Sequence, residues 1–124
     1  MDPSIILFSH SKICPVFSGC NKPLKNTLKE IKDGVLKIGS LPTITIIKNN
    51  NDAYISLNNR RLWILKECKI LGLLDVIKVN IKDFSKLSKR EQYRYNNNRY
   101  SAEAKLNKNL IRNFYNTKHT PVPR

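Results

Sequence analysis

The sequence predicts a small α/β (α+β) domain with a mixed sheet, followed by a basic helical extension. A length of 124 residues, of which 40% are hydrophobic, fits one globular domain. Short β-branched runs alternate with segments of helical periodicity over residues 1–84, in the order β-α-β-β-α-β. From residue 85 onward the composition becomes strongly basic. We therefore expect a core domain over residues 1–84 and a basic, tyrosine-containing extension or tail over residues 85–124.

The core is expected to begin with a strand and a helix. Residues 5–8 form a short apolar run that is typical of a buried strand. Residues 24–33 carry apolar side chains at positions i, i+4 and i+7 and lysines on the other face, the pattern of an amphipathic helix. Pro23 fits the first turn of this helix, and Gly34 fits its end.

A β-hairpin is expected next. Residues 43–47, Thr-Ile-Thr-Ile-Ile, follow Pro42 and have strong strand character. The asparagine-rich residues 49–52 indicate a turn. Residues 54–57 then return as a second strand.

A helix and a strand complete the core. Residues 60–70 are rich in apolar and helix-favouring side chains, and Gly72 follows them as a stop signal. Residues 76–81 alternate in the manner of a strand. Three of its side chains are expected to point inward: Ile77, Val79 and Ile81.

The extension is expected to contain two helices. Ser88 and Glu91 have the spacing of a capping box, which predicts a helix over residues 89–95. Ser101 is expected to cap a second helix with an apolar stripe. The stripe consists of Leu106, Leu110 and Phe114. It needs something to pack against, either the core domain or a protein partner.

Charge is the strongest functional signal in the composition. Lys and Arg number 23 against 9 Asp and Glu, a net charge of +14, and residues 85–124 account for +8 of it. Such an excess is typical of proteins whose partner is a polyanion. No apolar run reaches the ~18–20 residues of a membrane span, and the N-terminal residues lack the pattern of a secretory or organelle signal. We expect a cytoplasmic or nuclear protein that has no membrane partner.

Residues 41–47, LPTITII, and 54–63, YISLNNRRLW, resemble the central segment of the ParB/sulfiredoxin superfamily. In that family a proline-led strand and a hairpin return lead to a turn with paired basic residues that opens a helix. The strand, loop and helix expected before the hairpin also fit, so the resemblance covers residues 5–83. It implies a core domain of the ParB N-terminal type.

The turn itself departs from the family pattern. ParB-type members carry Gly-Glu-Arg-Arg there and use it to cradle the phosphates of a nucleotide. Here Asn58 and Asn59 replace Gly and Glu, whereas Arg60 and Arg61 are retained. Sulfiredoxins carry a reactive cysteine at the position of Asn59, and an amide is no nucleophile. The resemblance therefore implies phosphate contact rather than sulfinic-acid repair.

This turn and one loop form a candidate phosphate- or nucleotide-binding site. A helix start presents free N–H groups and a positive dipole end, arginine adds a fork that matches phosphate oxygens, and asparagine tolerates a left-handed turn. The resemblance implies that the loop over residues 9–20 faces the turn. The candidate residues are Ser9, His10, Ser11, Lys12, Asn58, Asn59, Arg60 and Arg61. The alternative interpretation is a solvated helix start beside an ordinary loop that buries Phe17.

The extension contains a candidate nucleic-acid interface. Basic side chains neutralise backbone phosphates, and tyrosine rings stack on unpaired bases. The candidate residues are Lys86, Lys89, Arg90, Tyr93, Arg94, Tyr95, Arg99 and Tyr100. The alternative interpretation is a basic helix whose tyrosines pack on the core domain.

Metal and catalytic motifs are weak. The 3 cysteines and 2 histidines show none of the paired spacings of a zinc site, so we expect no metal. The chain has no glycine-rich phosphate loop of a known pattern and no close pair of carboxylates. Catalysis therefore has little visible machinery, and a binding function is favoured over an enzyme.

The leading hypothesis is a nucleic-acid-binding protein, with RNA favoured over DNA, that acts as an accessory component of a larger assembly. The alternative is a nucleotide-binding enzyme or switch of the ParB/sulfiredoxin type, whose cofactor would be a nucleoside triphosphate with Mg²⁺. A third hypothesis is a protein-interaction module that uses the apolar stripe of the extension.

Overall fold

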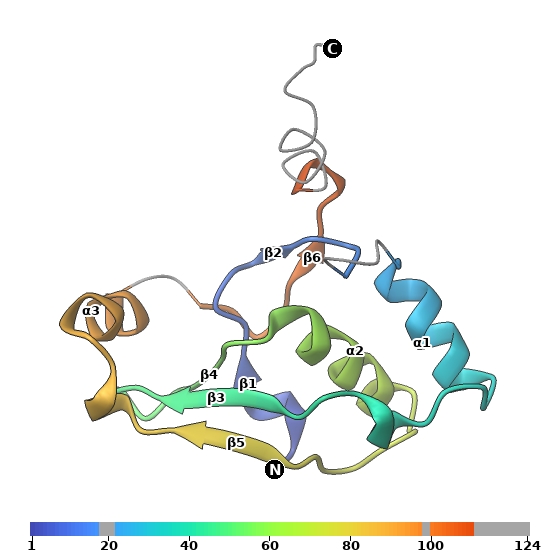
Figure 1. The fold of residues 1–124 in the computed structure, drawn as a ribbon, viewed down its shortest axis with the longest axis horizontal. Coiled ribbons are helices and arrows are strands. Elements are labelled where there is room, and N and C mark those ends of the chain that lie inside the picture. The colour runs from blue at the N-terminus through green and yellow to red at the C-terminus, as the bar shows by residue number, and fades with distance from the viewer. Residues whose placement is uncertain (18–21, 98–99, 111–124) are drawn as a thin grey trace.

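The computed structural model describes residues 1–17, 22–97 and 100–110, which form a larger and a smaller sheet with three α-helices (Figure 1). The strands of the larger sheet are β1 (Ile6–Leu7), β3 (Ile44–Lys48), β4 (Tyr54–Ser56) and β5 (Val79–Lys82). Their order is β1-β4-β3-β5. The inner strands β3 and β4 are antiparallel, and each outer strand is parallel to the inner strand beside it. The predicted α/β (α+β) class with a mixed sheet is confirmed.

Helices α1 (Leu24–Lys32) and α2 (Asn59–Ile70) cover one face of this sheet (Figure 1). Ile44 and Ile46 of β3 are fully buried and belong to the core cluster that these two helices complete. The chain turns after α1 at Gly34, whose φ of 77° is the left-handed conformation that a helix end favours. Both helices lie close to the predicted positions because their apolar faces and stop signals are local features of the sequence.

The segment after β5 covers part of the other face. It contains the short 3-10 helix η3 (Phe84–Lys86) and the helix α3 (Lys89–Asn97). The cluster on this face has Ile47, Ile55 and Leu87 at its centre, with Phe84, Tyr95 and Tyr100 packed against it. The predicted capping of α3 is also found, since the Glu91 N–H donates to Ser88 Oγ at 3.2 Å.

Asn49 links α3 to the hairpin. This side chain is only 3% exposed. Its Oδ1 accepts the N–H groups of Asn51 (2.9 Å) and Ala53 (3.0 Å), and its Nδ2 donates to the carbonyl of Tyr95 (3.0 Å). The division of the chain at residue 85 stays a prediction. The segment that follows residue 85 is joined to the hairpin through Asn49.

The smaller sheet lies above α2 (Figure 1) and pairs β2 (Lys12–Ile13) in parallel with β6 (Lys105–Leu106). The N–H of Lys105 donates to the Ser11 carbonyl at 2.8 Å. A separate bridge joins Phe8 to Ser101. Residues 100–106 therefore run back along the loop that follows β1.

This pairing shows that the helix predicted from Ser101 onward is wrong. Leu106 lies in β6, Leu110 lies in the 3-10 helix η4 (Lys108–Leu110), and Phe114 lies outside the described residues. The i, i+4 spacing of the two leucines imitates a helix. The backbone there bonds instead to residues more than 90 positions away, which a local pattern does not reveal.

The last strand of the core is shorter than predicted. β5 begins at Val79, which packs against the core. Ile81 is 59% exposed, so the expectation that it points into the core is wrong. It lies opposite Ile46 in the sheet, but β5 is one of the two edge strands and the helices do not cover it there.

Candidate functional site

The side chain of Asn58 holds the turn before α2. Its Oδ1 accepts the N–H of Thr45 in β3 at 2.7 Å, and its own N–H donates to Ser56 Oγ at 2.9 Å. Its φ is −132°, so the left-handed backbone considered for this turn is not used. The amide is needed instead to join the start of α2 to the middle of the sheet.

Asn59 connects the first turn of α2 to the loop after β1. Its Nδ2 donates to Ser9 Oγ (2.8 Å), and its Oδ1 accepts the Ser9 N–H (3.1 Å). This reciprocal pair engages both the oxygen and the nitrogen of the Asn59 side chain with one residue, Ser9. It fixes the loop over the helix start, so two segments that are 50 residues apart in sequence become one site.

The two arginines of the turn are restrained by backbone carbonyls. Arg60 Nη1 donates to Val16 O (3.0 Å), and Arg61 Nη1 donates to Thr43 O (3.1 Å). A guanidinium has five N–H donors, so each of these contacts leaves others for a ligand. Within the part of the chain that the structure describes, neither arginine forms a salt bridge.

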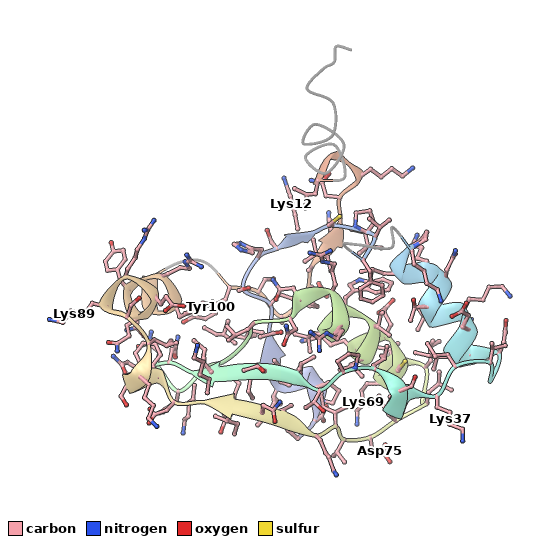
Figure 2. The ribbon with its side chains drawn as sticks, in the orientation of Figure 1. Lys12, Lys37, Lys69, Asp75, Lys89 and Tyr100 are labelled. Carbon is pink, nitrogen blue, oxygen red and sulfur yellow. The ribbon has the colours of Figure 1, made fainter. Side chains whose placement is uncertain are left out.

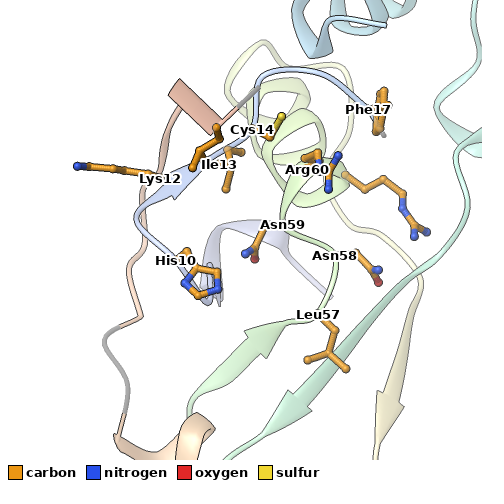
Figure 3. A pocket seen from close by; sticks show the side chains of 11 residues that line it. His10, Lys12, Ile13, Cys14, Phe17, Leu57, Asn58, Asn59 and Arg60 are labelled. Carbon is orange, nitrogen blue, oxygen red and sulfur yellow. The ribbon is translucent and has the colours of Figure 1, made fainter. Parts of the chain in front are cut away.

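A pocket of about 510 Å³ lies between this loop and the start of α2 (Figure 3). It is lined by His10, Lys12, Ile13, Cys14, Phe17, Leu57, Asn58, Asn59, Arg60, Arg61 and Leu110. Three of these side chains carry a permanent positive charge, and none of the lining residues that the structure describes is acidic. The first turn of α2 contains no acidic residue either. The pocket is therefore positively charged, and it lies at the N-terminus of α2, the positive end of the helix dipole.

The structure brings together most of the predicted phosphate-site residues. Six of the eight line the pocket, and Lys12 extends its ammonium group outward from the rim (Figure 3). Ser9 instead positions Asn59, and Ser11 lines a neighbouring hollow. Sequence reasoning missed Cys14 as a lining residue although it belongs to the identified loop, and it had no signal for Leu110, which reaches the pocket only through the pairing of β6 with β2.

The described residues of the predicted nucleic-acid interface lie on η3, on α3 and at Tyr100 (Figure 2). Lys86, Lys89, Arg90 and Arg94 are exposed, and none of them forms a salt bridge with another described residue. Tyr93 is 70% exposed.

The other two described tyrosines of this segment face the body of the protein. Tyr95 and Tyr100 pack on the cluster around Ile47, and the Asn49 amide lies 3.4 Å from the Tyr100 hydroxyl. They occupy the positions that the alternative interpretation gave them. Arg99, the remaining candidate, lies outside the described residues.

Two further searches of the described residues gave negative results. They contain no helix that is long and apolar enough to cross a membrane, and no group of three metal-ligating side chains. Cys68 is buried, and its burial raises the pKa of the thiol above the ordinary value. Cys20 and His119 lie outside the described residues.

Comparisons with models of protein families, with curated proteins and with solved structures returned no match for this chain. The resemblance to the ParB/sulfiredoxin superfamily therefore stays a prediction from the residues of the turn. The function has to be argued from the geometry of the pocket and of α3.

Proposed function

We propose that this protein binds nucleic acid, RNA in preference to DNA, through contacts with phosphate groups, as an accessory component of a larger assembly. One observation carries the proposal. Two segments distant in sequence meet in a pocket whose described lining contains Lys12, Arg60 and Arg61 and no carboxylate. A site with this charge attracts an anion, and it contains no carboxylate that would repel the negative oxygens of a phosphate diester.

The start of α2 adds to this attraction. The first N–H groups of a helix have no partner within the helix, and the positive end of the dipole favours negative charge there. The two arginines are held by carbonyl groups, so less rotational freedom is lost when they bind a phosphate. The pocket thus offers a preorganised position for one phosphate group.

The exposed face of α3 supplies additional contacts. Its cations are available to several phosphates of a chain, which a small anion does not offer. Tyr93 is exposed beside them and is suited to stack on an unpaired base, as single-stranded RNA presents it. This combination favours a polymer of phosphate diesters over an isolated phosphate.

The first test uses the anisotropy of a fluorescently labelled single-stranded RNA, measured over a series of salt concentrations. The triple variant Lys89→Glu, Arg90→Glu and Arg94→Glu should lower the slope of log affinity against log salt by about 2, because three phosphate contacts are lost. The matched control changes three exposed lysines on and after α1: Lys25→Glu, Lys32→Glu and Lys37→Glu. An equal effect of both triple variants would show that only net charge matters.

The pocket is tested by the single substitution Lys12→Glu, compared with Lys25→Glu. We expect the first to weaken RNA binding about tenfold, as the loss of one charge-assisted contact predicts, and the second to have little effect. If the unmodified protein does not bind RNA or DNA even at low salt, the proposed function is wrong. A duplex DNA of equal length measures the preference for RNA.

A second candidate function is the binding of a nucleoside triphosphate with Mg²⁺. Its support is the pocket volume, which falls in the range of ~300–1,000 Å³ typical of small-molecule sites. The described lining offers cations for the phosphates but no carboxylate for the metal, which would have to be held by the phosphates themselves. Equilibrium dialysis with labelled ATP and CTP distinguishes this candidate, because saturable micromolar binding supports it and its absence rules it out.

A further inference from the structure

A second hollow, of about 640 Å³, is lined on one side by α2. Residues 101–105 form its opposite wall, and Trp63 and Ile70 of α2 contribute to its lining. Trp63 is half-buried, and Ile70 is 77% exposed. The hollow therefore combines an aromatic side chain with an exposed aliphatic one, and two carboxylates, Glu67 and Glu103, also line it.

The walls of this hollow suit a flat heteroaromatic group. Lys66 lies over the ring of Phe8 with its Nζ 5.2 Å from the ring centre, and the same Nζ donates to the Ala102 carbonyl at 3.0 Å. Burial is the main cause of the lowered pKa of Lys66. The Trp63 indole N–H makes no hydrogen bond to another residue among those described, although indole donors at half-buried positions usually find one. An indole that lines a hollow and whose N–H has no partner among the described residues suits a nucleobase, which offers ring nitrogens and carbonyl groups as acceptors.

The two hollows adjoin each other. Lys12 lines both of them. Asn59 of the phosphate pocket and Trp63 of the second hollow are four positions apart on α2, so they lie on the same side of the helix about 6 Å apart along its axis. A ligand that has a phosphate at the helix start can thus place an attached group against the indole.

We propose that the hollow beside Trp63 binds an unpaired nucleobase whose neighbouring phosphate occupies the pocket at the start of α2. This inference rests on the proposed function and specifies its ligand as a single strand, because a base exposes its face to an aromatic side chain only when it is unpaired and unstacked. The Tyr93 face of α3 then contacts other nucleotides of the same strand.

The test uses the intrinsic fluorescence of Trp63, the one tryptophan of the chain. Titration with oligouridylate should quench this fluorescence with the same midpoint that anisotropy gives for the labelled strand. An abasic phosphate diester of equal length should bind more weakly and leave the fluorescence unchanged. Quenching by the abasic strand would contradict the assignment of the base to this hollow.

Substitutions provide an independent measurement. Trp63→Ala should lower affinity for oligouridylate about five- to 150-fold, the loss expected for one stacked base. Because Trp63 also packs on the core, Ile70→Glu serves as a second variant that removes no buried side chain. Its matched control is Val35→Glu, since Val35 is 76% exposed and lies after α1.

The results separate the two proposals. If the strand binds by anisotropy while Trp63 is not quenched and Ile70→Glu behaves like Val35→Glu, the base site is wrong and the proposed function stands. If the strand does not bind at all, both are wrong. Quenching together with a selective loss in Ile70→Glu supports the base site.

Discussion

Replacing Asn49 is expected to release α3 from the sheet without removing any charge from it. The side chain is 3% exposed and makes four hydrogen bonds: two to the hairpin turn, one to the carbonyl of Tyr95 and a longer one, of 3.4 Å, to the Tyr100 hydroxyl. A typical hydrogen bond contributes about 0.5–1.5 kcal/mol to stability, and a buried group left without its partner costs more. The bonds to the turn and to the Tyr95 carbonyl are all partly buried, so water only partly replaces the lost side chain. We therefore expect Asn49→Ala to lower the free energy of unfolding by about 2–3 kcal/mol.

Asn49→Asp separates the two halves of this effect. The carboxylate still accepts the two turn N–H groups, but it cannot donate to the carbonyl of Tyr95 and faces it with a negative charge. Urea denaturation gives the free energy of unfolding of both variants, and hydrogen exchange gives the opening of α3. We expect exchange in α3 to rise in both variants, while the turn amides of Asn51 and Ala53 stay protected only in Asn49→Asp. RNA affinity should fall in parallel, because the cations on α3 lose their fixed position.

The reasoning would be refuted if Asn49→Ala changed the free energy of unfolding by less than about 0.5 kcal/mol, the effect of an ordinary surface substitution. It would also fail if exchange in α3 did not change. The control is Asn50→Ala, at the neighbouring position of the same turn. The Asn50 side chain is exposed and makes no hydrogen bond to another described residue, and the backbone N–H that donates to Asn96 Oδ1 is kept in the variant.

Three shorter predictions follow from other contacts. Asn58→Ala should lower the free energy of unfolding by about 1–2 kcal/mol, measured by urea denaturation, because a backbone amide in β3 loses its acceptor. Bonds from neighbouring serines lower the pKa of Asp2 and of Asp83 in the folded state, so the stability that they contribute is present above the unfolded value of ~4 and is lost as the pH falls through the folded values. Melting temperatures measured from pH 6 to pH 3 should therefore fall less steeply for Asp83→Asn than for the unmodified protein. Iodoacetamide should label Cys14 before Cys68 in the native state, since Cys68 is buried and the pKa of its thiol is raised. Mass spectrometry of the digested protein gives the order, and labelling of Cys68 as early as Cys14 would contradict its burial.

Local signals were enough to predict the six elements of the core in their order. The hairpin follows from β-branched residues around an asparagine-rich turn, and the start of α3 follows from the spacing of Ser88 and Glu91. The exposure of Ile81 could not be predicted in this way. An alternating strand pattern does not say which strand lies at the edge of the sheet, and that position decides whether the helices reach the side chain.

The candidate site was predictable where its chemistry lies in short segments. The paired arginines and the loop containing Lys12 were both identified, and the structure joins them through Asn59 and Ser9. The hollow beside Trp63 was not predictable, because its second wall comes from residues 101–105. Those residues reach α2 through an isolated bridge between Phe8 and Ser101 and through the two-residue pairing of β6 with β2, and such short pairings leave no periodicity in the sequence.

The segment from residue 100 to residue 110 is part of both hollows rather than a simple appendage. Leu110 lines the phosphate pocket, residues 101–105 line the hollow beside Trp63, and β6 fixes the strand that carries Lys12. A truncation before residue 100 would therefore open both hollows and remove two basic residues of this segment together with the rest of the extension. Loss of binding after such a truncation could not be assigned to the charge of the extension. Point substitutions on the exposed face of α3 can be assigned to it, because they leave the β2–β6 pairing and both hollows in place.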